Sequence, residues 1–292
     1  MSDQKRLFEH YNPLEDRVGK SFFEGLPKDP GVYKMFGRQK QLLYVGKAKN
    51  IRNRLFTYRR AKMETTSRKM IRLIRMTHGI DIEICETEKE ALLLENKLIR
   101  THRPEFNHAK KQPDTYYFIG INRKKEVLQF SLQMHHPKSD FIYGAFKGHR
   151  LVRKAMGSIL RLLYMLENNI ESVFELPLQL TKKLTPMEYE LQFKQKDTVI
   201  TDLWPCLHNF LLGIDMSFIE QLTRYVTDRD LLNSFVGSMI LDDLDSLKWF
   251  FERCSSRNYQ ISDQLGLGTP LIPQEKLDDY IIEWVFARKD AM

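Results

Sequence analysis

The segment 43–55, which reads LYVGKAKNIRNRL, brings together side chains that suit the binding of an anion. Tyr44 supplies a phenol, Lys47 an ammonium group, and Arg54 a planar guanidinium group that can donate two parallel hydrogen bonds to an oxyanion. A helix that begins after Asn50 would add the backbone N–H groups of its first turn. Taken alone, the segment fits an ordinary strand, turn and helix with a solvated basic face equally well.

Two strands are needed to position these groups. Residues 42–45 form a short apolar run typical of a strand, which Gly46 ends, and residues 30–36 form a second such run. The segment 37–41 between them is polar and contains a glycine, as a hairpin turn requires. Tyr33 and Tyr44 are therefore predicted to lie on paired strands.

A carboxylate follows on a later helix. Residues 80–85 alternate apolar and polar side chains, which predicts a third strand, and Thr87 with Glu90 forms a capping box at the start of a helix. Glu95 lies in this helix among leucines, so we expect its carboxylate at the edge of the core. There it needs a cation or hydrogen-bond donors to offset its desolvation. The alternative is an exposed glutamate paired with Arg100.

The rest of the chain shows strands and then helices. Pro104 ends the helix, and Asn107 after it is either a turn residue or a hydrogen-bonding group of a site. Strand-like runs and one long apolar helical stripe follow at 116–121, 127–134, 141–143 and 150–163. Beyond residue 168 the sequence is mainly helical, with helices expected at 187–195, 218–227, 231–254 (continuous or broken) and 274–287.

Positive charge is concentrated in one part of the chain. The formal net charge is +8, yet residues 38–75 alone contain thirteen Lys and Arg residues and a single acid, Glu64. This concentration indicates a polyanionic partner, because each neutralised phosphate releases counterions. The alternative is a basic, solvated surface that has no partner.

The composition fits a globular protein of 292 residues, of which 42% are hydrophobic, enough for two domains with cores. The start has no apolar signal segment, and no uncharged run approaches the roughly 20 residues that span a bilayer, so a cytoplasmic protein without membrane contact is expected. The three cysteines are spaced unlike a disulfide framework or metal site, so buried reduced thiols are expected at Cys85, Cys206 and Cys254. Core positions are expected for Trp204, Trp249 and Trp284.

The order of these motifs resembles the GIY-YIG nuclease domain and, within that superfamily, the amino-terminal incision domain of UvrC-type excinucleases. The similarity covers about residues 26–107 and continues more weakly to about 146. The matching positions are Gly31, Val32 and Tyr33, then 44–49 (YVGKAK), Arg54, Tyr58, Glu95 in ALLLENKLI, and Asn107 in RPEFN.

The resemblance implies an α+β fold: a small mixed three-stranded sheet flanked by helices, then a short strand region and a mainly helical carboxyl-terminal half. The expected domains are a leader at 1–27, the nuclease domain at 28–110, a UvrC-like strand and helix extension at 111–168, and a mainly helical domain of unknown role at 169–292. The chain lacks the cysteine cluster of many UvrC proteins, so no iron–sulfur cluster is expected. It also lacks their second nuclease domain and helix-hairpin-helix module, and thus resembles the stand-alone UvrC homologue of the Cho type, which makes only the 3′ incision.

The resemblance also implies roles for individual residues. Glu95 would hold one divalent cation, Mg²⁺ or Mn²⁺, and Arg54 would contact the scissile phosphate. Tyr33 or Tyr44 would act as general base once nearby cations and the metal lower its pKa, with Lys47 supplying positive charge. Tyr58 and Asn107 would orient water or a phosphate oxygen. Further contacts to DNA are expected from Lys49, Arg52, Arg59, Arg60, Lys62, Arg68 and Lys69.

The function implied is a hydrolase: a DNA endonuclease that nicks one strand of damaged double-stranded DNA in nucleotide excision repair. It would act as a monomer, delivered by a UvrB–DNA complex, because no sequence-recognition motif is visible. Two alternatives stay open: a non-catalytic nucleic-acid-binding module, and a GIY-YIG endonuclease of the mobile-element or restriction kind.

Overall fold

The structure is a computed structural model that describes residues 13–62, 64–107, 116–124, 126–181, 185–192 and 199–290. The chain divides into two compact units: one holds residues 1–113 and 285–292, the other residues 114–284. The domain boundary expected after residue 110 lies outside the described residues.

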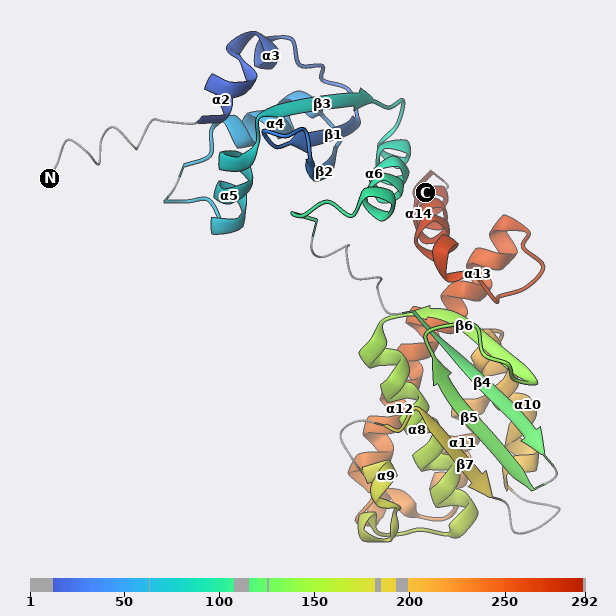
Figure 1. Cartoon of the computed structure of the whole chain (residues 1–292). Helices are drawn as coiled ribbons and strands as arrows, with labels where there is room; N and C mark the ends of the chain where they lie inside the picture. The colour runs from blue at the N-terminus through green and yellow to red at the C-terminus, as the bar shows by residue number, and fades with distance from the viewer. Residues whose placement is uncertain are drawn as a thin grey trace, which may run out of the picture. The chain divides into compact units, whose positions relative to one another are not determined.

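The first unit is built on a three-stranded sheet of β1 (Gly31–Phe36), β2 (Leu42–Ala48) and β3 (Gly79–Ile84), shown in Figure 1. The predicted hairpin is confirmed as β1 and β2, and the predicted third strand as β3. β2 continues through Gly46 to Ala48, so the prediction that Gly46 ends this strand is wrong. β1 lies in the centre and pairs antiparallel with both neighbours, so the sheet is antiparallel throughout and the expectation of a mixed sheet is wrong. A Cβ at Gly31 would lie 2.4 Å from the carbonyl oxygen of Glu83, so β1 and β3 approach closely only because this residue is glycine.

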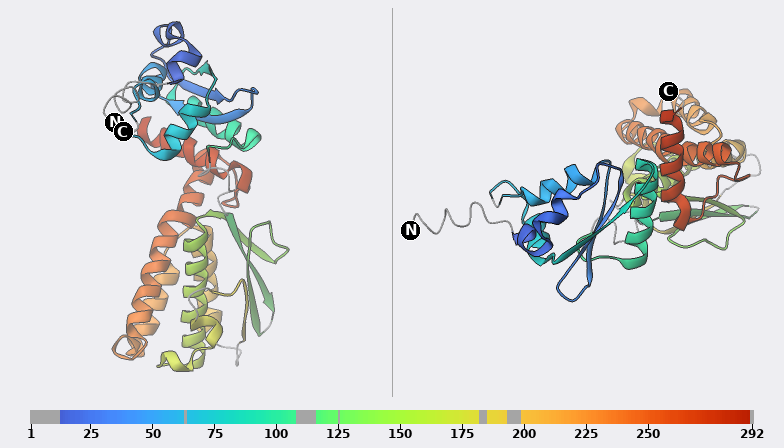
Figure 2. Two further views of the ribbon diagram at one scale, coloured as in Figure 1. Left: turned by 60° about the vertical axis from the view of Figure 1, so that its left-hand side comes forward. Right: turned by 90° about the horizontal axis from the view of Figure 1, so that it is seen from above.

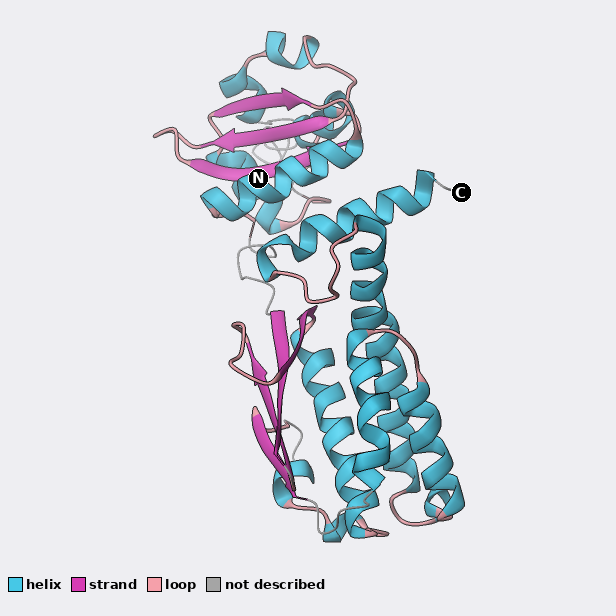
Figure 3. Ribbon diagram, turned by 90° about the vertical axis from the view of Figure 1, so that its right-hand side faces the viewer, coloured by secondary structure: helices cyan, strands magenta, loops and turns pink. Residues whose placement is uncertain are grey.

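Helices cover both faces of this sheet, as Figure 3 shows. On one face lie α2 (Pro13–Val18), α3 (Lys20–Glu24), α4 (Ile51–Arg59) and α5 (Arg68–Met76), and on the other lies α6 (Glu88–His102). The predicted helix starts are confirmed: the side chain of Asn50 accepts the N–H of Asn53 at 2.8 Å, and that of Thr87 accepts the N–H of Glu90 at 3.1 Å. Leu14 and Phe23 are fully buried in the same core as Tyr33, so α2 and α3 belong to this core.

The second unit packs a four-stranded antiparallel sheet against helices. Its strands lie in the order β6 (Phe141–Lys147), β4 (Tyr116–Lys124), β5 (Val127–Gln133) and β7 (Glu188–Gln192). Figure 3 shows helices along one side of this sheet. They include α8 (His149–Asn168), which confirms the predicted helix there, and α10 (Val199–Leu212), α11 (Ser217–Asp228) and α12 (Gly237–Phe250). The α+β class and the mainly helical carboxyl-terminal half are confirmed.

The strand β7 corrects one prediction. Residues 187–195 were expected to form a helix. Thr185 and Glu188 have the spacing of a capping box, and Pro186 lies where proline is common at the first helical position. The structure instead pairs 188–192 with β5, so the side chains alternate: Leu191 is buried, whereas Glu188 and Glu190 face outward. Acidic side chains suit an edge strand, because they discourage pairing with another chain.

The remaining elements are short turns and further helices. They are η1 (Val173–Glu175), α9 (Leu178–Thr181), η2 (Leu231–Asn233), the π-helical turn η3 (Phe251–Ser255), α13 (Ser256–Leu265) and α14 (Gln274–Asp290). The helix expected at 231–254 is interrupted between η2 and α12. From α12 onward the chain continues through η3 into α13 without a break (Figure 2). None of the described helices is long and apolar enough to span a lipid bilayer.

The predictions for cysteine and tryptophan are confirmed in part. Cys85 and Cys254 are buried and Cys206 is half-buried, and all three are free thiols. Trp204 is buried, as expected, with 8% of its surface exposed. The prediction is wrong for Trp249, which is 54% exposed on α12.

Candidate active site

The pairing of β1 with β2 places Tyr33 against Gly46. The two residues are register partners, and a Cβ at Gly46 would lie only 2.4 Å from the hydroxyl oxygen of Tyr33. Tyr44 lies on the same face of β2 two residues earlier, and its ring centroid is 6.0 Å from that of Tyr33. Glycine is therefore required at position 46 because two phenol rings pack against its α-carbon.

This packing makes the substitution Gly46→Ala costly. The added methyl group would overlap the buried ring of Tyr33, so we expect a loss of about 1–3 kcal/mol in the free energy of unfolding. Urea denaturation of the full chain measures this loss. The matched control is Gly79→Ala, because a Cβ there would meet no atom within 4 Å. Equal denaturation midpoints for the two variants would contradict the packing argument.

Arg54 and two tyrosines form a hydrogen-bonded cluster on this face. The hydroxyl oxygens of Tyr33 and Tyr58 are 2.9 Å apart. Arg54 donates from Nε to the Tyr33 hydroxyl at 3.1 Å and from Nη2 to the Tyr58 hydroxyl at 3.5 Å. Arg54 and Tyr58 are one turn apart on α4 and therefore neighbours on its surface. The two phenols hold the guanidinium group in one orientation at the sheet.

The protonation of these tyrosines differs from the expectation. Burial raises the pKa of Tyr33 well above its ordinary value, and the neighbouring phenols Tyr58 and Tyr44 raise it further. Burial also raises the pKa of Tyr58 to about 12. Arg54 lowers both pKa values, as the sequence analysis expected of a cation, but burial outweighs this effect. Both phenols are therefore hydrogen-bond partners that keep their protons near neutral pH.

Glu95 reaches the outer edge of β2 from the opposite face. It is buried, with 8% of its surface exposed, which confirms the predicted position at the edge of the core. Its Oε1 atom accepts the backbone N–H of Lys47 at 3.1 Å, so a hydrogen bond offsets part of its desolvation. Lys47 follows Gly46 directly. The carboxylate of Glu95 therefore binds the backbone next to the residue on which Tyr33 packs.

Asn107 supports the same edge of β2. Its Oδ1 atom accepts the N–H of Val45 at 2.9 Å, and its Nδ2 atom donates to the carbonyl oxygen of Val45 at 2.8 Å. Next to it, the N–H of Phe106 donates to the carbonyl oxygen of Leu43 at 2.9 Å. The amide group of Asn107 thus behaves like a short strand that pairs with β2, between Tyr44 and Lys47.

Glu88 is a charged neighbour that the sequence analysis missed. It lies at the start of α6, and its carboxylate accepts hydrogen bonds from Nζ of Lys47 at 2.7 Å and Nζ of Lys49 at 2.8 Å. These two hydrogen bonds lower the pKa of Glu88, so it is ionised at neutral pH. The sequence shows that Glu88 is an acidic residue in the first turn of a helix, but it does not show which cations bind it. An intramolecular carboxylate therefore holds Lys47, which was expected to supply positive charge in the site, and Lys49, which was expected to contact DNA.

The other predicted DNA-contacting residues fall into two groups. Arg59 forms a two-point ion pair with Glu15 on α2, at 3.0 and 2.6 Å, and links the two helices. In contrast, Arg52 and Arg60 border a hollow around Phe56, with guanidinium carbons 5.9 and 5.4 Å from its ring centroid. The remaining cations are exposed: Lys62, Arg68 and Lys69.

The donor set at Glu95 limits the metal ions that would fit there. Within the described residues, no three or more His, Cys, Asp or Glu side chains gather as a metal site. Glu95 would therefore contribute one carboxylate to an ion that takes its other ligands from water and substrate. Mg²⁺ suits such a site, because it retains several waters and binds proteins through one or two carboxylates.

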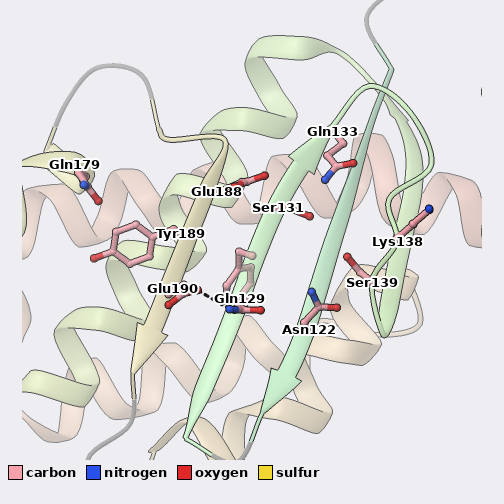
Figure 4. A pocket seen from close by; sticks show the side chains of 11 residues that line it. Asn122, Gln129, Ser131, Gln133, Lys138, Ser139, Gln179, Glu188, Tyr189 and Glu190 are labelled. Carbon is pink, nitrogen blue, oxygen red and sulfur yellow. Dashed lines mark hydrogen bonds between the residues drawn. The ribbon is translucent and has the colours of Figure 1, made fainter.

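A separate hollow lies on the outer face of the sheet in the second unit (Figure 4). Asn122, Gln129 and Ser131 line it from β4 and β5, and Glu188 and Glu190 from β7. These side chains bond to their neighbours: Gln129 donates to Glu190, and Ser131 donates to the carbonyl oxygen of Gly120. The two glutamates disfavour a phosphate, so we read this hollow as the solvent-facing side of the sheet.

The antiparallel sheet, the two tyrosines that pack on Gly46, Arg54 on the next helix and Glu95 at the strand edge all lie within one segment of the chain, 29–108. Residues 29–108 match the family model described as the UvrC-like GIY-YIG domain. The first unit therefore contains a UvrC-like GIY-YIG domain.

Related proteins share this part of the chain. UvrABC system protein C of Geobacter sp. (strain M21) is 35% identical over 116 residues, which cover 39% of this chain and 18% of that protein. The protein of the same name from Sodalis glossinidius is 33% identical over 156 residues, which cover 53% of this chain and 25% of that protein. The chain thus spans a quarter or less of the length of these relatives.

Solved structures give a local match as well. The GIY-YIG N-terminal endonuclease domain of UvrC from Thermotoga maritima, as a point mutant bound to its catalytic divalent cation, is 30% identical and has a TM-score of 0.27. The match covers 30% of this chain and 92% of that domain. The same domain bound to magnesium is 27% identical, also with a TM-score of 0.27, and the match covers 33% of this chain and 98% of the domain.

Proposed function

We propose that this protein is a divalent-metal-dependent DNA endonuclease that nicks one strand of damaged DNA on the 3′ side of the lesion, in nucleotide excision repair. The observation that supports this proposal most strongly is one site in a UvrC-like GIY-YIG domain. There Tyr33, Tyr44 and Arg54 lie on one face of the β1–β2 hairpin, and Glu95 lies at its edge.

In this proposal Arg54 contacts the scissile phosphate. Its guanidinium group already donates to the hydroxyls of Tyr33 and Tyr58, so it is oriented before DNA arrives. Tyr44 first loses its own proton and then, as a phenolate, accepts the proton of the attacking water. It is only half-buried, whereas burial keeps the protons on Tyr33 and Tyr58. Lys47 adds positive charge near the developing phosphorane. Tyr33 and Tyr58 therefore act by positioning Arg54.

Glu95 is the residue that would hold the divalent cation, Mg²⁺ or Mn²⁺. When bound, such an ion neutralises charge on the phosphate oxygens and makes water easier to deprotonate. The backbone N–H of Lys47 fixes the carboxylate of Glu95. Asn107 supports the site indirectly, because its amide holds the backbone of Val45 between Tyr44 and Lys47. Its proposed role is thus positioning, in place of direct contact with water or phosphate.

The partner in this proposal is a UvrB–DNA complex, which would place a monomer of this protein at a lesion in the cytoplasm. The relatives with the same domain are named as components of the UvrABC system, which supports this assignment. The exposed cations of the first unit would bind the DNA backbone on either side of the scissile phosphate.

Supercoiled plasmid DNA tests the reaction class. With Mg²⁺ and UvrB, the wild-type protein is expected to convert supercoiled plasmid that carries bulky adducts to nicked circles, and EDTA is expected to stop the conversion. Linear product without a nicked intermediate would contradict a single-strand nuclease. Binding of the plasmid without cleavage under any divalent metal would favour the non-catalytic binding module.

Glu88 is expected to restrain DNA binding. Its substitution by Gln removes the charge that pairs Lys47 and Lys49, so both ammonium groups can contact phosphates. We expect tighter binding to duplex DNA, and a salt dependence whose slope, log Kd against log salt, steepens by about 0.9 for each added phosphate contact. Fluorescence anisotropy at several salt concentrations measures both.

The control for this substitution is Glu83→Gln, which removes a comparable ion pair, to Lys34, outside the predicted DNA-binding set. This variant is expected to bind DNA as the wild type does. Weaker binding by Glu88→Gln would instead show that Glu88 holds Lys47 in place for the DNA.

A further inference from the structure

The second unit contains a groove between the start of α8 and the end of α12. The two helices lie side by side in the views of Figure 2. Arg150 and Lys154 line the groove from α8, and Lys248, Trp249 and Glu252 line it from α12 and the π-helical turn. All of these residues lie within 114–284, so this groove belongs to one compact unit and not to the site at β1 and β2.

Trp249 is exposed although its neighbours form the core. Leu247 and Phe250 are fully buried, whereas 54% of Trp249 is open to solvent. The guanidinium carbon of Arg253 lies 5.6 Å from its ring centroid, which orients the ring. The indole ring of Trp249 is a good platform for stacking a nucleobase. The adjoining π-helical turn is a feature that is common at functional sites.

The two walls of the groove differ in charge: the α8 side carries the cations Arg150 and Lys154, whereas the other side carries the carboxylates of Asp242, Asp245 and Glu252 beside one cation, Lys248. On the α8 side, Arg150 and Lys154 are exposed, and within the described part of the chain neither pairs with a carboxylate. On the α12 side, Asp245 and Glu252 are exposed carboxylates close to Trp249 in the sequence. A ligand that fits this pattern has negatively charged groups, which face the cations of α8. It also has an aromatic ring with hydrogen-bond donors, which faces Trp249 and the carboxylates of the α12 side.

We propose that this groove binds an unpaired stretch of a DNA strand. The phosphates lie along Arg150 and Lys154, one base stacks on Trp249, and the carboxylates of Asp245 and Glu252 accept hydrogen bonds from the amino group of that base. The strand is unpaired, because bases inside a duplex cannot stack on a side chain. The choice of DNA as the nucleic acid rests on the proposed nuclease function. Since thymine lacks an exocyclic amino group, the groove prefers cytosine to thymine.

Tryptophan fluorescence of the full-length protein in EDTA tests this proposal without any cleavage. Titration with the octanucleotides (dC)8 and (dT)8 is expected to quench emission, with tighter binding of (dC)8. Trp249→Ala is expected to weaken (dC)8 binding by about 10-fold, measured by anisotropy of a labelled oligonucleotide. The double variant Arg150→Ala, Lys154→Ala is expected to reduce the salt slope by about 0.7 per lost phosphate contact.

The matched control is Phe174→Ala, which removes an aromatic side chain that is 94% exposed and does not line the groove. Equal affinity of wild type, Phe174→Ala and Trp249→Ala for (dC)8 would overturn the proposal. Nicking of adduct-bearing plasmid by the same proteins, with UvrB and Mg²⁺, separates the two claims. If the wild type nicks and Trp249→Ala binds (dC)8 as the wild type does, the groove proposal is rejected and the nuclease proposal stands. If Trp249→Ala binds (dC)8 more weakly but the wild type does not nick, the nuclease proposal is rejected and binding in the groove stands.

Discussion

Replacing Glu95 with glutamine is expected to lower the rate of DNA nicking by about 10³-fold. The substitution keeps the size of the side chain, and the amide oxygen can still accept the N–H of Lys47, but the charge that would hold a divalent cation is lost. Charge stabilisation by a metal ion is worth several kcal/mol, and each 1.36 kcal/mol corresponds to about tenfold in rate. Single-turnover nicking of adduct-bearing plasmid DNA with UvrB and Mg²⁺ measures the loss.

The control for this experiment separates catalysis from binding and folding. Glu83→Gln changes an exposed carboxylate of the same domain and is expected to nick at the wild-type rate. The Glu95→Gln protein is expected to unfold at nearly the same urea concentration as the wild type and to bind DNA at least as well in EDTA. Nicking by Glu95→Gln within tenfold of the wild type would reject Glu95 as the metal ligand.

Replacing Tyr44 with phenylalanine is expected to lower the nicking rate by about 10²- to 10³-fold, the usual cost of losing a general base. The ring stays, so the packing against Tyr33 is preserved. Tyr44 is assigned as the base because burial raises the pKa of Tyr33, and that of Tyr58 to about 12, which leaves both as poor proton acceptors near neutral pH. The wild-type rate is expected to rise with pH, and Tyr44→Phe to lose this rise.

Tyr58→Phe is the matched control for Tyr44→Phe. It also removes one hydroxyl from the cluster, but the hydrogen bond from Arg54 to Tyr33 remains. We expect a loss of roughly tenfold or less, and a rate that still rises with pH. If Tyr58→Phe instead lost the pH dependence and Tyr44→Phe kept it, the assignment of the base would be wrong.

Local signals explain why much of the first unit could be predicted from sequence. The alternation in 80–85 and the caps Asn50 and Thr87 each act within a few residues, and the strand β3 and the helices α4 and α6 follow from them. The position of Glu95 also followed from its own helix, where leucines surround it. The resemblance to the GIY-YIG family, and not these local signals, joined the residues of the candidate site into one set.

Contacts between distant parts of the chain could not be predicted in this way. Asn107 and Val45 are 62 residues apart, and Arg59 and Glu15 are 44 apart, so no local pattern announces either pair. The strand β7 was mistaken for a helix because its identity depends on β5, a distant strand with which it pairs. The exposure of Trp249 also depends on distant contacts. Its sequence neighbours are core residues, but the packing of α12 against other elements decides that the side of the helix carrying Trp249 faces solvent.

The same limit applies to the protonation of the tyrosines. Sequence shows that phenols and cations share a site, which predicts lowered pKa values. It does not show how deeply each phenol is buried, and burial has the opposite effect. For Tyr33 and Tyr58 burial is the larger influence, and this difference separates the three tyrosines of the site into two supports and one proposed base.

Incision of a duplex that carries one bulky adduct, with labels on both strands, tests the central claim most directly. The protein is mixed with this duplex and Mg²⁺ in the presence or absence of UvrB bound at the adduct. The proposal predicts a single cut, on the 3′ side of the adduct and in the damaged strand, only when wild-type protein, metal and UvrB are all present. Cuts at the same rate on an undamaged duplex without UvrB, or no cut under any of these conditions, would contradict it.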